Sequence, residues 1–338
     1  MSVTLKPPGS LELPSEQGIL FAGSQLLPIE RCQVADEQEV MERYLCARAP
    51  VIFTRAMDSW PAMRKWSFDF FAQHMGDEQV IAKDDLVSAN AIRRVKMREF
   101  LLYCRYPFFS ELGKVASSRP FYVSYPPFGM HPELLDDIRH PGVLKNSYLQ
   151  LQGELLKWYY EIFGWIYIGP QGTVTPLHVD QFMSHTWIAQ IAGSKRFLFI
   201  SPQDFGGIPD RKLRDHLRSD CFYEEGDDEN EVCDKSGQKL KAYEGILSPG
   251  ELLFFPAGWA HYVVSLEPSI SVSFNYANES NLIPHVMMIS RKLPQWARKL
   301  DSARFREANR VTWTTSHFAS LGREDGQQQA VRSEGCAI

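Results

Sequence analysis

The chain has 338 residues, 44% of them hydrophobic, which is enough for one large globular domain with a small appendage. The formal net charge of −5 gives no support to nucleic-acid binding, although it does not exclude it. No stretch is apolar for long enough to predict a transmembrane helix, and residues 1–18 lack the charged-then-apolar pattern of a secretory leader. The 6 cysteines are irregularly spaced and form no CxxC pair, which predicts reduced thiols and no structural zinc. We therefore expect a cytoplasmic protein without a membrane partner, or a nuclear one if the source is eukaryotic.

The first part of the chain is predicted to be an extended arm over residues 1–26, followed by mixed structure. Ser67 has the chemistry of a helix N-cap, and Gly76 has that of a helix stop. Together with apolar periodicity, these signals predict helices at 36–48, 67–76 and 97–103, and strands at 50–53 and 121–123.

From Trp165 onward the chain becomes rich in predicted strands, which are separated by Gly and Pro turns. The expected strands are 165–169, 186–191, 195–200, 252–255, 260–265 and 270–276. Many short strands of this kind predict a sandwich or a barrel. A polar insertion at 204–247 interrupts them and carries an acidic run at 224–231. We expect this acidic part of the insertion, 220–234, to be a solvated loop, with a lid or a patch that attracts a basic substrate as the alternatives.

The end of the chain is predicted to turn helical over 281–321, and 322–338 is expected to be a disordered tail. Pro284 and Pro294 lie where helix starts tolerate proline, and Trp296 and Leu300 form an apolar stripe. These helices either pack on their own domain or form a homodimer through residues 281–312.

The most specific pattern in the chain is a set of separated metal-ligand candidates. His178 and Asp180 are two positions apart, so on a strand both side chains point to the same face. His261 follows in the context Pro256-Ala257-Gly258-Trp259-Ala260-His261. Two imidazoles and one carboxylate are the facial ligand set that suits non-haem iron(II) and leaves coordination positions open.

Several blocks around these residues resemble the Jumonji C (cupin-like) family of iron- and 2-oxoglutarate-dependent oxygenases. They are 49–53, 60–61, 175–180, 193–197 and 256–261, in the order that the family has them. The resemblance implies a mainly β catalytic domain over 27–280, with peripheral helices around a double-stranded β-helix, the jelly-roll or cupin barrel. It also implies that His178, Asp180 and His261 hold Fe(II), and that 2-oxoglutarate and O2 are co-substrates.

The same resemblance assigns five residues to the co-substrate. Lys195 matches the lysine that pairs with the distal carboxylate of 2-oxoglutarate, and Thr175 matches a hydroxyl that binds the same group. Tyr122 matches a tyrosine in that role, with a core tyrosine as the alternative. Ser273 and Asn275 lie on one face of an alternating strand and match positions that contact the co-substrate, while exposure of that face to water is the alternative.

One feature departs from the family. Some relatives carry a co-substrate asparagine on the strand after the His-x-Asp motif, but 186–190 contains none. Thr186 is a candidate substitute, and His185 lies near the site in sequence without matching a ligand pattern.

The chain therefore resembles an Fe(II)- and 2-oxoglutarate-dependent dioxygenase that hydroxylates a protein or peptide side chain, in the manner of the small protein-hydroxylase members of the family. Alternatives that the residues leave open are an oxygenase for a small molecule or nucleic acid, lysine demethylation, and a catalytically silent module that only binds partners. We expect no zinc or reader module of the kind found in many histone-demethylating members, because the sequence shows no pattern for one.

Overall fold

The computed structural model describes residues 21, 24–33, 49–84, 91–107, 110–115, 119–139, 163–220, 240–278 and 280–290. The chain divides into two compact units, Met1–Met288 and Ile289–Ile338, and almost all described residues belong to the first. No helix within the described ranges is long and apolar enough to cross a membrane.

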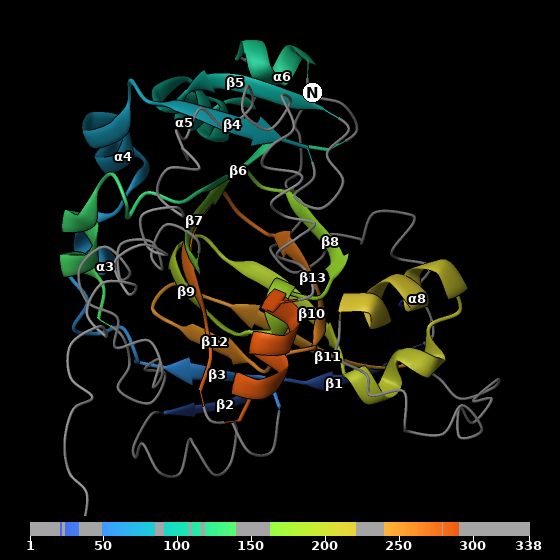
Figure 1. Ribbon diagram of the computed structural model, residues 1–338. Coiled ribbons are helices and arrows are strands. Elements are labelled where there is room, and N and C mark those ends of the chain that lie inside the picture. The colour runs from blue at the N-terminus through green and yellow to red at the C-terminus, as the bar shows by residue number, and fades with distance from the viewer. Residues whose placement is uncertain are drawn as a thin grey trace, which may run out of the picture. The chain divides into compact units, whose positions relative to one another are not determined.

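The first unit is built on two β-sheets that curve around a common interior (Figure 1). The smaller sheet has five strands, in the spatial order β1 (Gln25–Pro28), β11 (Lys241–Leu247), β10 (Lys195–Ile200), β13 (Ala260–Ser265) and β8 (Val174–His178). The larger sheet has nine strands, in the order β2 (Glu30–Gln33), β3 (Val51–Thr54), β12 (Leu252–Phe255), β9 (His185–Ala192), β14 (Ser269–Tyr276), β7 (Gly164–Gly169), β6 (Tyr122–Tyr125), β4 (Gln79–Lys83) and β5 (Ile92–Lys96).

The chain passes repeatedly between the two sheets from β8 to β14. β8, β10, β11 and β13 lie in the smaller sheet, whereas β9, β12 and β14 lie in the larger one. All pairings among these seven strands are antiparallel. This is a jelly-roll core and confirms the predicted fold class, which is mainly β with peripheral helices.

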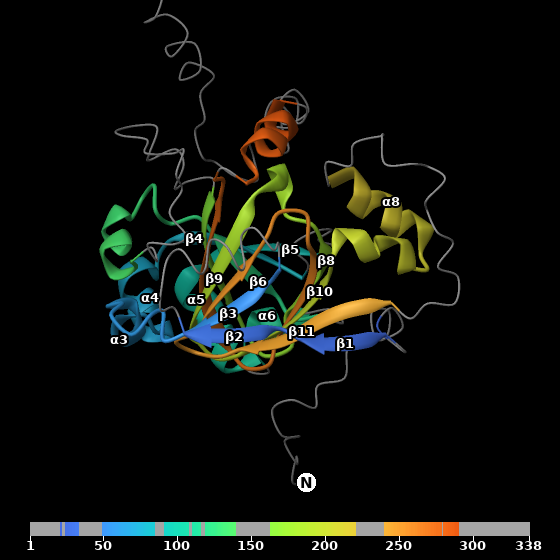
Figure 2. The same cartoon turned by 90° about the horizontal axis from the view of Figure 1, so that it is seen from below.

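Short helices precede the barrel, and some of them lie beside β4 and β5 at one end of the larger sheet (Figure 2). They are α3 (Ala62–Lys65), α4 (Phe68–Met75), α5 (Met97–Arg105), α6 (Glu111–Val115) and the 3-10 turn η3 (Pro132–Asp137). Ser67 caps α4 by accepting a hydrogen bond from the backbone N–H of Phe70 at 3.1 Å, as its position predicted. Helix α5 begins where the sequence indicated and runs two residues further than predicted, to Arg105.

The interior between the sheets holds an apolar cluster as well as polar groups. Alternation along β10 points Lys195, Phe197 and Phe199 into the barrel, and the two phenylalanines belong to a cluster of ten buried residues. Lys195 stands at the start of the same inward row. The fold therefore places one buried cation in line with the hydrophobic core.

The outer face of the smaller sheet has its own hydrophobic cluster. Leu198 and Tyr262 point outward from β10 and β13 and pack with Leu217 of α8 (Arg211–Asp220). The turn η6 (Pro202–Gly207) contributes Phe205 to the same cluster. This layer covers the sheet that carries two of the candidate ligands.

Most predicted strands are observed within one residue of their predicted bounds, and β10, β12 and β13 match at both ends. The stretch 204–247, expected as a polar insertion, contains α8 and ends in β11, a strand of the smaller sheet. The acidic run at 224–231, the predicted helix at 36–48 and the chain beyond residue 290 lie outside the described residues. Of the predicted C-terminal helices, the described part is a helix over 282–290.

Candidate metal centre

The structure brings the three candidate ligands together at one end of the barrel. His178 is the last residue of β8, and the register pairs it directly with His261 on β13. Asp180 lies just beyond the strand rather than within it, but its extended backbone (φ −62°, ψ 145°) keeps its side chain on the side of His178. One donor atom from each residue lies within 4.8 Å of the other two.

Backbone carbonyl groups orient both imidazoles. His178 Nδ1 lies 2.8 Å from the carbonyl oxygen of Pro176, and His261 Nδ1 lies 3.3 Å from that of Trp259. A carbonyl oxygen only accepts, so each Nδ1 carries a proton, and in the neutral ring the lone pair of Nε2 is available to a metal. Both Nε2 atoms face Asp180 Oδ1, at 3.6 Å and 3.8 Å. This is how histidines that bind metal are commonly held.

The second oxygen of the Asp180 carboxylate is held by two side chains. Thr186 Oγ1 donates to Asp180 Oδ2 at 2.5 Å, and Asn275 Nδ2 lies 3.1 Å from the same oxygen. Asn275 Nδ2 also lies 2.7 Å from Thr186 Oγ1 and 3.0 Å from Ser184 Oγ. Because β9 and β14 pair Thr186 with Asn275, this network is built into the sheet. Oδ1 is left to face the histidines.

A strained turn follows Asp180. Phe182 and Met183 have φ values of 63° and 49°, a left-handed conformation that bulky residues rarely adopt. Asn281 Nδ2 donates to the carbonyl of Met183 at 2.9 Å, and His285 Nδ1 lies 2.6 Å from the carbonyl of Phe182. Such conformations cost about 1–3 kcal/mol each and persist where neighbouring groups enforce them. The start of the 282–290 helix therefore helps to fix the chain next to a candidate ligand.

The electrostatics of the cluster favour binding of a cation. Burial raises the pKa of Asp180, but the charges of His261 and His178 and the hydrogen bonds from His178 and Thr186 outweigh it and hold that pKa well below its usual value. Burial and the neighbouring His178 lower the pKa of His261 to about 4. Burial also acts to lower the pKa of His178, but its bond to Asp180 raises it above the ordinary value. At neutral pH the carboxylate is therefore ionised and His261 is neutral, the forms that bind metal.

The donor set fits one divalent transition-metal ion. Donors about 2.1 Å from an ion and at right angles to one another lie about 3 Å apart. The observed separations of 3.6 Å and 3.8 Å need only a small inward movement of the side chains. Two imidazole nitrogens and one carboxylate oxygen on one face suit non-haem iron(II) and leave the opposite face open for other ligands.

A second cluster surrounds Lys195, at the level of Ser271 on β14. Lys195 Nζ donates to Ser271 Oγ at 2.7 Å and to Tyr122 Oη at 3.1 Å. The ammonium also lies 5.3 Å and 5.5 Å from the ring centres of Tyr122 and Tyr167. The hydroxyl of Tyr122 is in turn hydrogen-bonded to Thr175. The structure therefore gathers three sequence-predicted residues, Lys195, Tyr122 and Thr175, around one point.

The charge of Lys195 is not balanced within the described part of the chain. Its side chain is 3% exposed, and no described carboxylate lies within ion-pair distance of its ammonium. Burial lowers the pKa of Lys195 to about 7. A buried cation surrounded only by hydroxyl groups and aromatic rings is costly until an anion joins it. The site is therefore suited to the carboxylate of a small ligand.

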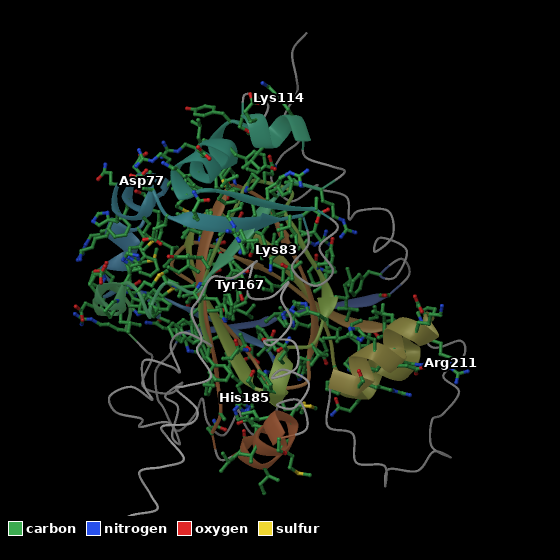
Figure 3. All side chains as sticks on the ribbon, turned by 45° about the horizontal axis from the view of Figure 1, so that its top comes forward. Asp77, Lys83, Lys114, Tyr167, His185 and Arg211 are labelled. Atoms are coloured by element: carbon green, nitrogen blue, oxygen red, sulfur yellow. The ribbon has the colours of Figure 1, made fainter. Side chains whose placement is uncertain are left out.

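Ser273 and Tyr167 lie between the two clusters. The hydroxyl of Tyr167 is hydrogen-bonded to Ser273, and the charge of Asp180 contributes to the raised pKa of Tyr167. Along β14, Asn275 marks the metal end and Ser271 the lysine end, which are about 13 Å apart at about 3.3 Å per residue. With the side chains pointing inward, the remaining gap suits a short dicarboxylate. Tyr167 is labelled near the centre of the view in Figure 3.

The structure assigns positions that the sequence left open. Asn275 and Thr186 contact the candidate ligand Asp180, whereas Ser271 and Tyr167, which sequence reasoning missed, contact Lys195. Ser271 lies on the same alternating face as Ser273 and Asn275, so the pattern already contained the signal for it.

His185 does not reach the pocket. It is buried, its Nδ1 accepts a hydrogen bond from the backbone N–H of Ala257 at 3.0 Å, and its Nε2 lies 2.8 Å from Ser280 Oγ. Figure 3 places it beside the 282–290 helix. It therefore supports the turn that leads to His261 rather than offering a ligand.

Comparisons with known proteins agree with this architecture. The profile of the cupin-like domain family matches residues 37–282. The arginine-specific demethylase JMJ20 of Arabidopsis thaliana is 29% identical over 258 residues, which cover 71% of this chain and 55% of that protein. The lysine-specific demethylase JMJ30 of Arabidopsis thaliana is 31% identical over 246 residues, covering 70% and 52%.

The 2-oxoglutarate and iron-dependent oxygenase JMJD4 of Mus musculus is 26% identical over 284 residues, which cover 80% of this chain and 63% of that protein. The chain thus spans about half to two thirds of the length of these relatives. The family profile covers most of the chain, and the jelly-roll core is the fold expected of it. The chain belongs to the cupin-like, Jumonji C family.

Proposed function

We propose that this protein is an Fe(II)- and 2-oxoglutarate-dependent dioxygenase. The observation that carries the proposal is the presence of two complementary clusters that both adjoin β14. His178, Asp180 and His261 present three metal donors, and Lys195 presents a buried cation that no described carboxylate balances. Relatives named as 2-oxoglutarate and iron-dependent oxygenases support this assignment.

Within this proposal each part of the chain has a defined task. When bound, iron and 2-oxoglutarate supply the oxidation of a substrate C–H bond by O2, with release of succinate and CO2. His178, Asp180 and His261 hold the metal and leave its other face open. Lys195, with the hydroxyls of Ser271 and Tyr122, binds the distal carboxylate and so orients the co-substrate.

The supporting residues preserve this arrangement. Thr186 and Asn275 hold one oxygen of Asp180 and direct the other toward the histidines. The aromatic walls formed by Tyr122 and Tyr167 keep water away from the co-substrate carboxylate, so its attraction to Lys195 is stronger than in solution.

For the substrate, we propose a protein or peptide side chain that becomes hydroxylated. The names of several relatives, which are demethylases specific for arginine or lysine, support a protein substrate. A small molecule, a nucleic acid or a methylated lysine remains the alternative. A module that only binds partners is disfavoured by the intact ligand set and by the buried Lys195.

Succinate formation tests the proposal. The full chain is incubated with Fe(II), 2-oxoglutarate and air, and succinate is measured in the wild type and in Asp180→Ala. We expect succinate from the wild type and none from the variant, with similar unfolding temperatures. Equal succinate formation by both proteins would overturn the metal assignment.

A homodimer through 281–312 also remains our proposal. In its described part, Ile283, Val286 and Met287 are 73%, 53% and 44% exposed. Exposed apolar side chains on one helix favour a protein contact. Light scattering of the wild type and of Trp296→Arg at micromolar concentration tests it, because a monomeric wild type excludes the dimer.

A further inference from the structure

Tyr167 stands beside Lys195, but the contact between them involves only the aromatic ring. The register pairs Tyr167 on β7 with Ser271 on β14, and Lys195 Nζ donates to the hydroxyl of Ser271 at 2.7 Å. Paired residues of antiparallel strands point to the same face of the sheet. The centre of the Tyr167 ring accordingly lies 5.5 Å from Lys195 Nζ. The ring is part of the wall around the buried ammonium, and the hydroxyl group is left for another task.

That hydroxyl group points toward the candidate metal ligands. Ser271, Ser273 and Asn275 follow one another on one face of β14. Asn275 Nδ2 lies 3.1 Å from Asp180 Oδ2, so this end of the row adjoins the metal ligands. Tyr167 starts at the level of Ser271, yet its hydroxyl is hydrogen-bonded to Ser273, one step closer to Asp180. The phenol therefore spans the interval between the two clusters.

Part of the surface of Tyr167 is free of contact with the described side chains. Trp165 and Tyr167, which point inward from β7, are partly exposed. Ile166 and Ile168, which point to the other face of the same strand, are buried. In a closely packed interior the inward side chains would be buried as well, because protein interiors leave few voids. The inward face of β7 therefore borders a space that a ligand can fill.

Tyr167 has a proton to donate into that space. Burial raises the pKa of its hydroxyl group well above the usual value, and the hydrogen bond with Ser273 opposes this rise. A hydrogen bond that lowers the pKa of an acid favours its charged form, so Ser273 donates this bond and the oxygen of Tyr167 accepts it. The phenol is therefore protonated at neutral pH, and among the described residues no group accepts its proton.

The other polar groups near the metal ligands are already engaged. Some relatives carry a co-substrate asparagine on the strand after the His-x-Asp motif, but residues 186–190 contain none. Thr186, the candidate substitute, donates to Asp180 Oδ2 at 2.5 Å, and Asn275 also binds this oxygen. A ligand beside the metal therefore needs a donor from another strand, and Tyr167 supplies one.

We propose that Tyr167 is a co-substrate-binding residue whose hydroxyl group donates a hydrogen bond to the keto-acid end of 2-oxoglutarate, the end that faces the metal. Lys195 holds the distal carboxylate, so the two residues hold opposite ends of the same molecule. The acceptor is an anion shielded from water, and hydrogen bonds to such groups are stronger than those between neutral groups. This inference rests on the proposed oxygenase function, because it concerns the co-substrate of that function.

Replacement by phenylalanine isolates the hydroxyl group. Tyr167→Phe keeps the aromatic ring, and with it the contact to Lys195, but removes the donor. The matched control is Tyr125→Phe on the neighbouring strand β6. Tyr125 pairs with Ile166 and so points to the opposite face of the sheet, where its hydroxyl donates to Glu78. Unfolding temperatures and calorimetric titrations with Mn(II) show whether each variant is folded and keeps its metal site.

Two readouts of co-substrate binding are measured without oxygen. Calorimetric titration of the Mn(II)-loaded protein gives the affinity for 2-oxoglutarate. The visible spectrum of the Fe(II)-loaded protein at saturating 2-oxoglutarate gives the charge-transfer band of a keto acid chelated to iron(II). The energy of this band depends on hydrogen bonds to the keto acid, whereas the loss of a contact to the distal carboxylate leaves the band in place.

We expect Tyr167→Phe to weaken 2-oxoglutarate binding by roughly 10–100-fold, as the loss of a hydrogen bond to a charged group predicts. It should also shift the charge-transfer band to shorter wavelength. Ser273→Ala, which removes the group that orients the phenol, should shift the band in the same direction by less. Tyr125→Phe should change neither readout.

Three results overturn the inference. One is unchanged affinity in a folded Tyr167→Phe protein, and another is weaker affinity with an unshifted band. The third is an equal shift in Tyr125→Phe. If Tyr167→Phe does not fold, then an unshifted band in Ser273→Ala overturns the inference instead.

Failure of the underlying function has a different signature. If the wild type shows no charge-transfer band with Fe(II) and 2-oxoglutarate, then the oxygenase proposal fails. If the band forms in the wild type and stays in place in Tyr167→Phe, then only the role of Tyr167 fails.

Discussion

Replacement of Lys195 by methionine should stabilise the ligand-free protein and at the same time abolish binding of the co-substrate. The side chain is 3% exposed, and burial lowers its pKa from 10.5 to about 7. Between these values the unfolded chain binds a proton that the folded chain does not bind. Stability of the ligand-free protein therefore rises with pH from 7 to 10.5, and the full cost is present at pH 7 and below.

The magnitude follows from the pKa difference. The difference of 10.5 minus about 7 corresponds to a cost of the order of 5 kcal/mol at about 1.36 kcal/mol per unit. Methionine has a similar volume and removes this cost, but Ser271 and Tyr122 lose a partner, at about 1–3 kcal/mol. A net gain of about 2–4 kcal/mol should raise the unfolding temperature by roughly 5–10 °C.

The same substitution removes the charge that the co-substrate needs. Loss of one member of a buried ion pair costs about 3–5 kcal/mol, which weakens binding by roughly two to three orders of magnitude. Differential scanning calorimetry of Mn(II)-loaded protein, with and without 2-oxoglutarate, measures both effects. 2-Oxoglutarate should raise the unfolding temperature of the wild type and leave that of Lys195→Met unchanged. A less stable ligand-free variant that 2-oxoglutarate still stabilises would refute this reasoning.

The remaining predictions concern the residues around the ligands and the effect of pH. Thr186→Val removes a donor to Asp180 and should weaken Mn(II) binding by roughly 10–100-fold in calorimetric titrations. Equal Mn(II) affinities of wild type and variant would show that Thr186 does not support the metal site. His285→Leu should also weaken Mn(II) binding, whereas His285→Asn, which can still donate to the Phe182 carbonyl, should retain more of it; the reverse order would contradict the role of this bond. In Mn(II)-saturated wild type, 2-oxoglutarate affinity should fall by roughly tenfold per unit as pH rises above about 7, because Lys195 loses its proton; affinity that is flat up to pH 9 would contradict it.

The barrel strands could be predicted because their signals are local. β10, β12 and β13 are short apolar runs bounded by turn residues, and their observed bounds equal the predicted ones. β5 (Ile92–Lys96) was missed because Arg93, Arg94 and Lys96 hide its apolar positions, as is common at a sheet edge. β11 was not predicted because Gly245 and the charged residues near it are typical of a loop. In the structure a Cβ at Gly245 would lie 2.9 Å from the Ile29 side chain, so close packing between strands explains that glycine.

The candidate metal ligands could also be predicted, since a His-x-Asp pair and a distant histidine in the context 256–261 have the chemistry of a metal-binding set. The hydrogen-bond partners of the residues around these candidate ligands could not be predicted. Alternation correctly placed Ser273 and Asn275 on one face, but only the pairing of β9 with β14 shows that Asn275 holds Asp180. Nothing in the residues Phe182 and Met183 indicates a left-handed turn, because contacts from the distant 282–290 helix impose it.

Iron and 2-oxoglutarate should bind side by side, at the histidine cluster and at Lys195. An anomalous difference map from crystals soaked with Fe(II) and 2-oxoglutarate without oxygen tests it most directly. We expect one metal peak about 2.1 Å from His178 Nε2, His261 Nε2 and an Asp180 oxygen. We also expect the distal carboxylate of 2-oxoglutarate to lie against Lys195 Nζ. A metal peak elsewhere, or 2-oxoglutarate bound away from Lys195, would contradict it.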